Sequence, residues 1–187
     1  MRYSRRAFTK TALALGAASV LPAPAIARER TLKIGFVTPQ TGPLAVFAEP
    51  DEFVLSQFRT GLGDGLASGG KTYPIEFLVK DSQSNPNRAA DVARELIIDE
   101  EVDLLLGTAT PETTNPVADA AENDEVPCIT NDTPWQPHFF GRRGDPAVGF
   151  EWTYHFFWGL EDVIAAFLDM WDGAGVAKNV GGLFPND

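Results

Sequence analysis

Short apolar runs alternate regularly with helix-like segments along this chain, and that alternation most constrains its fold. Strand-like runs occupy residues 32–37, 73–81, 104–106 and 127–130. The segments between them place apolar residues at helical spacing. Such alternation is typical of right-handed βαβ units, whose strands lie parallel in one sheet. The sequence therefore predicts an α/β fold.

Prolines mark where the helices are expected to start. Pro50 indicates the first turn of a helix within 44–66. Asn115 and Pro116 form an N-cap and first helical residue, which predicts a helix from Pro116 to about residue 123. A last helix is expected over 160–171. Its buried side would consist of Val163, Ile164, Phe167, Leu168 and Trp171.

Residues 102–116 have the layout of a ligand site at the edge of a parallel sheet. A strand ends at Gly107, small hydroxyl residues follow, and a helix then begins. Loops after the carboxyl ends of strands, together with helix N-termini, are where α/β folds bind small molecules. The stretch holds neither a nucleophile–base pair nor a metal-ligand cluster, so we expect it to hold a solute without altering it.

The C-terminal part has a different composition. Residues 131–150 are rich in proline and glycine and lack periodicity, which predicts a connection instead of a core element. The aromatic-rich segment 151–159 then precedes the last helix and a strand expected at 179–184. Because one helix and one strand cannot complete a sheet, we expect the 187 residues to be the N-terminal part of a longer protein. The alternative is a small one-domain protein whose tail lies on the first sheet.

Residues 1–27 have the features of an export signal. Arg5 and Arg6 precede Phe8 and a short apolar run, and residues 25–27 match a small-x-small cleavage site. The run is too short for a permanent membrane span. The paired arginines resemble the twin-arginine export signal, with an ordinary secretory signal as the alternative. Both interpretations predict a periplasmic or secreted protein.

The chain is acidic, with a net charge of −11. Four of its fifteen basic residues lie in the leader, which leaves eleven basic against 26 acidic residues and a net charge of −15. Such a surface repels nucleic acid and anionic membranes, so neither is expected as a partner. The single cysteine, Cys128, lies in a strand-like run and is expected to be buried and inert.

Two common enzyme signatures are missing from the sequence. It contains no GxSxG nucleophile elbow and no HExxH zinc motif. His138 and His155 lack the spacing of a metal-binding pair, so surface or packing roles are expected for them. The expectation is a protein that is not an enzyme and uses no cofactor or metal.

Five short motifs occur in order along residues 31–187. They are Ile34-Gly35-Phe36 with Thr41-Gly42-Pro43, the turn Ser68-Gly69-Gly70, Asp81 with Asn85-Pro86, Gly107 with Pro116, and Asn186-Asp187. In these motifs the chain resembles the type I periplasmic binding proteins of ABC transporters, in the branch of the leucine/isoleucine/valine-binding protein. The resemblance implies two three-layer α/β lobes that close on a ligand about a hinge. It divides the chain into a signal peptide (1–27), lobe I with its connection (31–150) and the beginning of lobe II (151–187).

The resemblance also implies which residues of lobe I contact the ligand. The family uses an aromatic residue after the Thr-Gly-Pro turn and the loops after the third and fourth strands. Matching loop to loop gives Phe47, then Ala109, Thr110 and Thr113, then Asn131, Asp132, Thr133 and Trp135. Hydroxyls and backbone amides would hold the polar end of a solute, while aromatic residues cover its apolar body.

Each of these residues also has a structural interpretation. The hydroxyls of the 108–113 loop could cap a helix or stabilise a turn, Phe47 could pack in the core, and Trp135 could pack between lobes. In the amino-acid binders of the family, a serine holds the ligand carboxylate where this chain has Pro111, which offers neither hydroxyl nor N–H. This departure argues against an ordinary branched-chain amino acid.

The function implied is that of an extracytoplasmic solute-binding receptor of an ABC importer. It would act as a monomer, bind a small polar or amino-acid-like solute, and deliver it to a membrane permease. The alternatives are an exported sensory ligand-binding domain and an exported enzyme on the same α/β layout.

Overall fold

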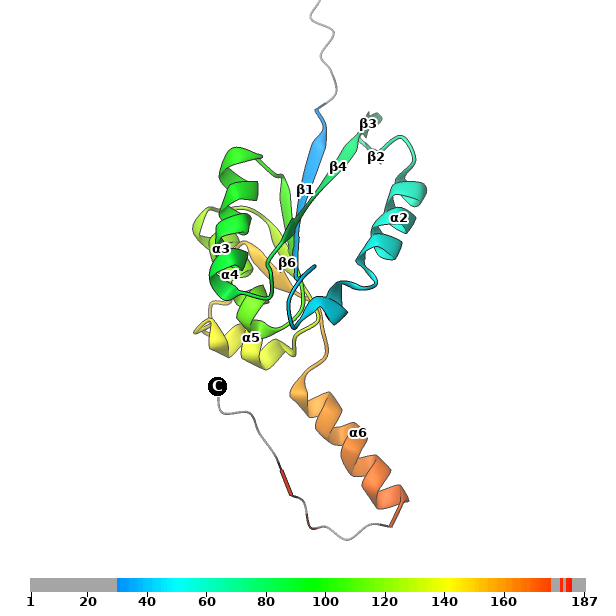
Figure 1. Cartoon of the computed structure of the whole chain (residues 1–187), viewed down its shortest axis with the longest axis vertical. Helices are drawn as coiled ribbons and strands as arrows, with labels where there is room; N and C mark the ends of the chain where they lie inside the picture. The colour runs from blue at the N-terminus through cyan, green and yellow to red at the C-terminus, as the bar shows by residue number, and fades with distance from the viewer. Residues whose placement is uncertain (1–29, 176–178, 180, 183–187) are drawn as a thin grey trace, which may run out of the picture. The chain divides into compact units, whose positions relative to one another are not determined.

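A five-stranded parallel sheet forms the centre of the fold (Figure 1). The computed structural model describes residues 30–175, 179, 181 and 182. In spatial order the strands are β4 (Ile75–Asp81), β1 (Leu32–Thr38), β5 (Leu104–Gly107), β6 (Cys128–Thr130) and β7 (Thr153–His155). The predicted α/β fold is confirmed. The predicted leader lies outside the described residues, as do residues 180, 183 and 184 of the strand predicted at 179–184.

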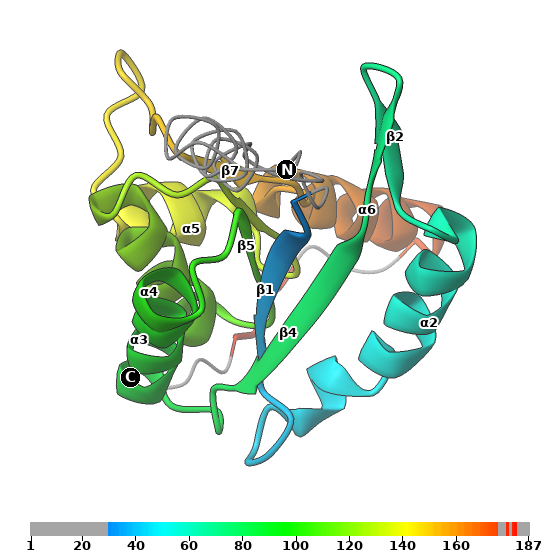
Figure 2. The same cartoon turned by 90° about the horizontal axis from the view of Figure 1, so that it is seen from above.

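Helices cover the two faces of the sheet unequally. They are η1 (Ala45–Ala48), α2 (Asp51–Leu62), α3 (Pro86–Arg94), the π-helical η2 (Glu95–Asp99), α4 (Pro111–Asn123), α5 (Trp135–Gly141) and α6 (Leu160–Gly173). Figure 2 shows α3 and α4 on one face of the sheet and α2 on the other. Within the described part of the chain, no helix is both long enough and apolar enough to cross a membrane.

The hydrophobic core lies between the sheet and helices α3 and α4. Val37, Leu105 and Cys128 supply its strand side. The helix side consists mainly of small residues: Ala89, Val92, Ala93, Val117, Ala120 and Ala121. The close approach also depends on Gly107, where a Cβ atom would lie 3.0 Å from Val117 Cγ1. Cys128 is fully buried, as predicted, and burial raises the pKa of its thiol to about 12.

The opposite face, under α2, is covered much less completely. Leu55 of α2 is buried, whereas Phe53, Val54 and Phe58 are 68%, 43% and 56% exposed. Since a Phe side chain buries a large apolar area when packed, this exposure shows that the core of the described residues is one-sided.

Helix α4 begins earlier than the sequence predicts. It starts at Pro111, with Thr110 as an N-cap in extended conformation, so that Pro116 lies inside the helix. Both prolines suit a first helical turn, and the helix uses the earlier one. Asn115, predicted as the N-cap, instead donates its side-chain amide to the Pro137 carbonyl, with the two atoms 3.2 Å apart.

A helix also lies within the segment predicted to be a connection. Residues 131–150 contain α5, which follows Pro134 and has Pro137 in its first turn. A proline costs no hydrogen bond there, because the first N–H groups of a helix have no intrahelical acceptor. The clustered prolines therefore mark the start of a helix, although their number predicted a connection without one.

Two strand features were not predicted. The Ser68-Gly69-Gly70 turn joins β2 (Leu66–Ser68) to β3 (Lys71–Tyr73) in an antiparallel hairpin that precedes β4. Strand β7 pairs with β6, so the five-stranded sheet includes residues that follow position 150.

The predicted last helix exists as α6, but its predicted buried side is wrong for the part of the chain described. Ile164, Phe167 and Leu168 are 57%, 47% and 53% exposed, and Val163 and Trp171 are only half-buried. An amphipathic pattern predicts that one side of a helix is apolar, and other elements decide whether that side is covered.

Candidate functional site

The carboxyl ends of β1, β5 and β6 meet at one edge of the sheet. Val37 pairs with Gly107, and Gly107 pairs with Thr130. The loop that follows β6, residues 131–133 (the β6 loop), is tied to β5 because the Asn131 amide donates to the Gly107 carbonyl, 3.1 Å away. Polar groups that follow neighbouring strands are thus brought to one place, as parallel topology requires.

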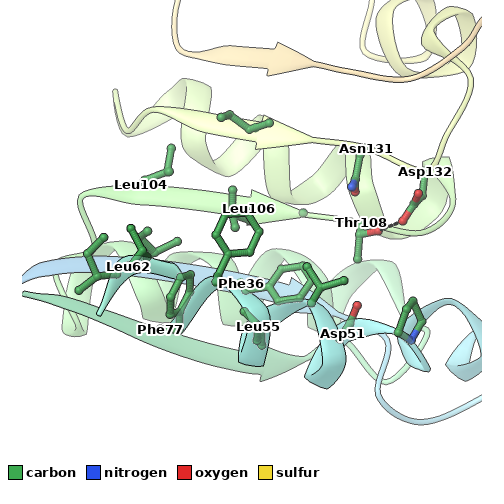
Figure 3. Close-up of a pocket in the computed structure, with 17 residues that line it drawn as sticks. Phe36, Asp51, Leu55, Leu62, Phe77, Leu104, Leu106, Thr108, Asn131 and Asp132 are labelled. Carbon is green, nitrogen blue, oxygen red and sulfur yellow. Dashed lines mark hydrogen bonds between the residues drawn. The ribbon is translucent and has the colours of Figure 1, made fainter. Parts of the chain in front are cut away.

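A cavity of about 570 Å³ opens at this edge and runs between α2 and the sheet. Figure 3 shows its two ends: apolar side chains line the interior, and Asp51, Thr108, Asn131 and Asp132 lie together at the polar end. The apolar lining comes from Ile34, Phe36, Val54, Leu55, Phe58, Leu62, Ile75, Phe77, Leu104, Leu106 and Ile129. This volume and this amphipathic lining suit a small organic molecule.

Two carboxylates lie at the polar end of the cavity. Thr38 Oγ1 donates to Asp51 Oδ2 at 2.6 Å, and the Thr108 hydroxyl donates to Asp132 (Figure 3). Burial raises the pKa of the Asp51 carboxyl against the lowering effect of the Thr38 hydrogen bond, and the nearby Asp132 charge raises it further. This end of the cavity therefore disfavours additional negative charge.

Two of the predicted site residues, Asn131 and Asp132, line this cavity, and the other six do not. Asp132 has a left-handed backbone, with φ of 65°, which turns the β6 loop back toward the sheet. Asn131 is exposed at the polar end. The β6 loop is thus the predicted segment that the structure brings to the cavity.

The predicted residues after β5 lie at the start of α4. Ala109 is fully buried, with φ of 99°, and the buried hydroxyl of Thr110 has no hydrogen-bond partner among the described residues. The amides of Thr113 and Thr114 both donate to the Thr110 carbonyl, at 3.1 and 2.9 Å. These amides already have acceptors, and Pro111 has no N–H, so this helix start is a poor anion site.

The remaining three predicted residues have different environments. Thr133 is fully buried, and within the described residues its hydroxyl has no partner. Trp135 is 37% exposed and donates its indole N–H to Glu161 of α6 at 2.8 Å. Phe47, in η1, is also 37% exposed. Trp135 therefore links α5 to α6, and Phe47 is free of the core.

Sequence reasoning missed Asp51 as a lining residue and did not place Thr108 among the chosen contacts. Asp51 follows Pro50 at the start of α2, where an acidic residue is ordinary because it stabilises the helix dipole. Its closeness to the sheet depends on how α2 lies over β1 and β5. For Thr108 the signal existed, since it is the first hydroxyl residue after β5.

Asp81, the last residue of β4, organises the loops beside it. Its carboxylate accepts from Thr41 Oγ1 at 2.6 Å, from the Thr41 amide at 3.2 Å and from the Gln83 amide at 2.8 Å. Although burial acts to raise it, these hydrogen bonds hold the pKa of Asp81 below its usual value. Asp81 thereby joins the loop after β1 to the loop after β4.

Neither a metal centre nor a phosphate loop is found in the described part of the chain. No group of three or more His, Cys, Asp or Glu residues there could hold a metal ion. Residues 65–72 match the GxxxxGK[ST] pattern of phosphate loops, but they form the β2–β3 hairpin. A phosphate loop joins a strand to a helix N-terminus, so this match lacks the required context.

Over residues 31–186 the chain matches the family model described as periplasmic binding protein. By sequence, no curated protein matches it significantly. The chain is also similar to solved structures that are 19–23% identical, a level at which the likeness shows the fold alone.

Three of these structures illustrate the likeness. The solute binding protein of an ABC transporter from Rhodopseudomonas palustris BisB5, in complex with 3,4-dihydroxy benzoic acid, has 22% identity and a TM-score of 0.63, covering 78% of this chain and 37% of that one. The leucine binding protein LivK from Thermotoga maritima has 19% identity and a TM-score of 0.62, covering 78% of this chain and 38% of that one. The third is the branched-chain amino acid transporter substrate binding protein LivJ from Streptococcus pneumoniae, in complex with isoleucine. It has 23% identity and a TM-score of 0.56, covering 70% of this chain and 34% of that one. The chain spans slightly more than a third of the length of these proteins.

Proposed function

Because this chain belongs to the periplasmic binding protein family, we propose that the full-length protein is an extracytoplasmic solute receptor of an ABC importer. It binds a small solute between two lobes without altering it and delivers it, as a monomer, to a membrane permease. The solved structures with this fold include ABC transporter solute-binding proteins, which supports this choice of class.

The observation that carries the proposal is the convergence of polar loops at the carboxyl edge of the sheet. Asn131, Asp132 and Thr108 gather there at the mouth of a cavity of about 570 Å³. A solute with one polar end and an apolar body matches this lining, because the polar groups orient it while apolar burial stabilises it.

The charge at this edge limits the part of the solute that faces this lobe. Asp51 and Asp132 repel an anionic group, and Pro111 removes an amide donor from the start of α4. A hydroxyl, an amide or an amino group fits better here than a carboxylate. We therefore propose that a solute carboxylate, if present, is bound by the other lobe.

A ligand screen by thermal unfolding of the full-length protein tests the proposal. Isoleucine, leucine and 3,4-dihydroxybenzoic acid are the first probes, followed by polar and aromatic solutes. A ligand at about 100-fold its Kd should raise the melting temperature by roughly 5 °C, because it binds the native state alone. Recovery of chemically changed ligand would indicate an enzyme instead, and binding without effect on transport would indicate a sensory domain.

Export through the twin-arginine route is a separate part of the proposal, supported by Arg5, Arg6 and Phe8. Replacing both arginines by lysine should leave the protein in the cytoplasm, as measured by cell fractionation. Unchanged export of this variant would contradict the twin-arginine route and favour an ordinary secretory signal.

A further inference from the structure

Both histidines of the 187-residue sequence lie in one cluster beside the β6 loop. His138 comes from α5 and is 2% exposed, and His155 comes from β7. Their rings stack, with centroids 4.2 Å apart and planes at 21°. The stack therefore joins the sheet to the helix that follows the β6 loop.

The partners of His155 specify one neutral tautomer. Its Nε2 lies 2.7 Å from the Thr133 carbonyl oxygen, which can only accept a hydrogen bond, so Nε2 carries the proton. Its Nδ1 lies 2.8 Å from Thr130 Oγ1 and accepts from that hydroxyl. A neutral ring satisfies both contacts, and through them His155 holds the β6 loop from both sides.

The partners of His138 specify the opposite tautomer. Its Nδ1 lies 3.0 Å from Asn115 Oδ1, and the Asn115 amide nitrogen donates to Pro137, which fixes that amide's orientation. Nδ1 therefore carries the proton. Nε2 lies 3.3 Å from Arg142 Nη1 and 3.4 Å from Thr130 Oγ1. Because a guanidinium can only donate, the shorter contact is a hydrogen bond only when Nε2 is unprotonated.

Protonation would place like charges together in this cluster. A proton on His138 Nε2 would face the Arg142 guanidinium, whose side chain is 1% exposed, and would repel a charged His155 in the stack. Burial weakens the screening of such repulsion by water.

The acidic groups around the cluster are already engaged elsewhere. Asp119 of α4 accepts from Arg142 Nε at 2.7 Å, and Glu122 of α4 accepts from the Thr153 hydroxyl at 3.0 Å. Asp132 of the β6 loop accepts from the Thr108 hydroxyl. Asp132 favours a charged His155, but neither ring has a carboxylate among its hydrogen-bond partners in the described residues.

We propose that His138 and His155 are positioning residues that hold the β6 loop while both rings are neutral, and that their protonation releases this loop. The consequence for solute binding rests on the proposed function: affinity at the carboxyl edge falls in acid. The hold on the loop itself does not depend on that function.

The direction of both pKa shifts agrees with this geometry. Burial lowers the pKa of His138 to about 3, and repulsion from His155 and Arg142 adds to the effect. Burial also lowers the pKa of His155, against the hydrogen bond to Thr133, and Arg142 lowers it further.

Nitrogen-15 NMR of the two rings in the full-length protein tests the hold directly. At pH 7 we expect a proton on Nε2 of His155 and on Nδ1 of His138, and no titration near pH 6.5. As the pH is lowered, ring protonation should coincide with at least tenfold faster hydrogen exchange of two amides: Asn131, which donates to Gly107 at the start of the loop, and Phe156, which donates to Thr130 just before it. Ordinary titration of either ring near pH 6.5, or ring protonation with unchanged exchange, would overturn the proposal.

Two substitutions of His155 separate positioning from simple packing. His155→Phe keeps a ring for the stack but loses both hydrogen bonds, so exchange at Asn131 should rise about tenfold at pH 7. His155→Gln can still donate to Thr133 and accept from Thr130, so it should restore most of the protection. Protection that is kept in His155→Phe and lost in His155→Gln would show that only ring packing matters.

The binding consequence is measured with whichever of isoleucine and 3,4-dihydroxybenzoic acid stabilises the protein. Its Kd should rise at least tenfold as the pH is lowered from 7.5 through the range in which NMR shows the rings to be protonated, and less in His155→Gln. If neither probe nor any solute binds, the proposed function fails while the NMR result still decides the role of the histidines. Binding that is unchanged across this range would refute the link between the loop and affinity.

Discussion

The two faces of the sheet differ sharply in how they are packed, although the same strands form both. Toward α3 and α4, Leu105 and Cys128 are fully buried among small helix residues. Toward α2, their neighbours Leu106 and Ile129 line a cavity of about 570 Å³. Strand periodicity assigns residues to faces, but whether a face is closed depends on the elements laid over it.

The largest test of this difference is a matched pair of truncations in β5. In the 187-residue chain, Leu105→Ala should lower the free energy of unfolding by about 3 kcal/mol, because it creates a cavity in a close-packed core. Leu106→Ala should cost about 1 kcal/mol, since its side chain already borders open space. Urea unfolding measures both, and equal losses would show that the α2 face is closed in solution.

Much of the closed face could be predicted from sequence, because its signals are local. The strands β1, β5 and β6 and the buried residues Ala89, Val92 and Ala93 follow from short apolar runs and helical spacing. The two wrong predictions, the start of α4 and the absence of α5, also have local causes. Either of two prolines could begin α4, and Pro137 lies within the first turn of α5.

The candidate site was only partly predictable, because its parts meet through tertiary contacts. Asn131 and Asp132 follow a strand, so parallel topology alone brings them to the edge of the sheet. Asp51 reaches that edge because α2 lies over the sheet. His138 and His155 stack across α5 and β7 without any motif spacing, which sequence reasoning cannot detect.

Thiol reactivity should separate the two faces at neighbouring positions of β6. Cys128 is buried and its pKa is raised to about 12, so alkylation of the native chain by iodoacetamide should be slow. In a Cys128→Ala background, Ile129→Cys introduces a thiol on the α2 face, where Ile129 is 44% exposed. We expect it to react on the order of 100-fold faster, measured by mass spectrometry. Similar rates would contradict the difference between the faces.

A smaller effect should appear in the pH dependence of stability. A histidine whose pKa is lowered on folding contributes stability that is full above pH 6.5 and is lost as the pH falls toward the folded value, about 3 for His138. Between pH 6.5 and 5.5 this loss is about 1 kcal/mol for one such group. Asp51, on the α2 face, has a raised pKa, so its effect on the pH dependence of stability has the opposite sign. Its stabilising contribution is lost as the pH rises through the folded pKa. Urea unfolding at several pH values in this range compares the free energy of unfolding of the native chain with that of His138→Gln. If that free energy depends on pH equally in both, a buried neutral ring is ruled out.

The central claim, that a solute binds at the carboxyl edge of the sheet, is tested most directly by calorimetry on the full-length protein. Asn131→Ala removes a polar group at that edge. Asn123→Ala makes the same change on the exposed last turn of α4, at the other end of the βαβ unit formed by β5, α4 and β6. With the solute that most raises the melting temperature, we predict that Asn131→Ala weakens binding about tenfold while Asn123→Ala leaves it unchanged. Equal affinity of both variants would contradict a binding site at this edge.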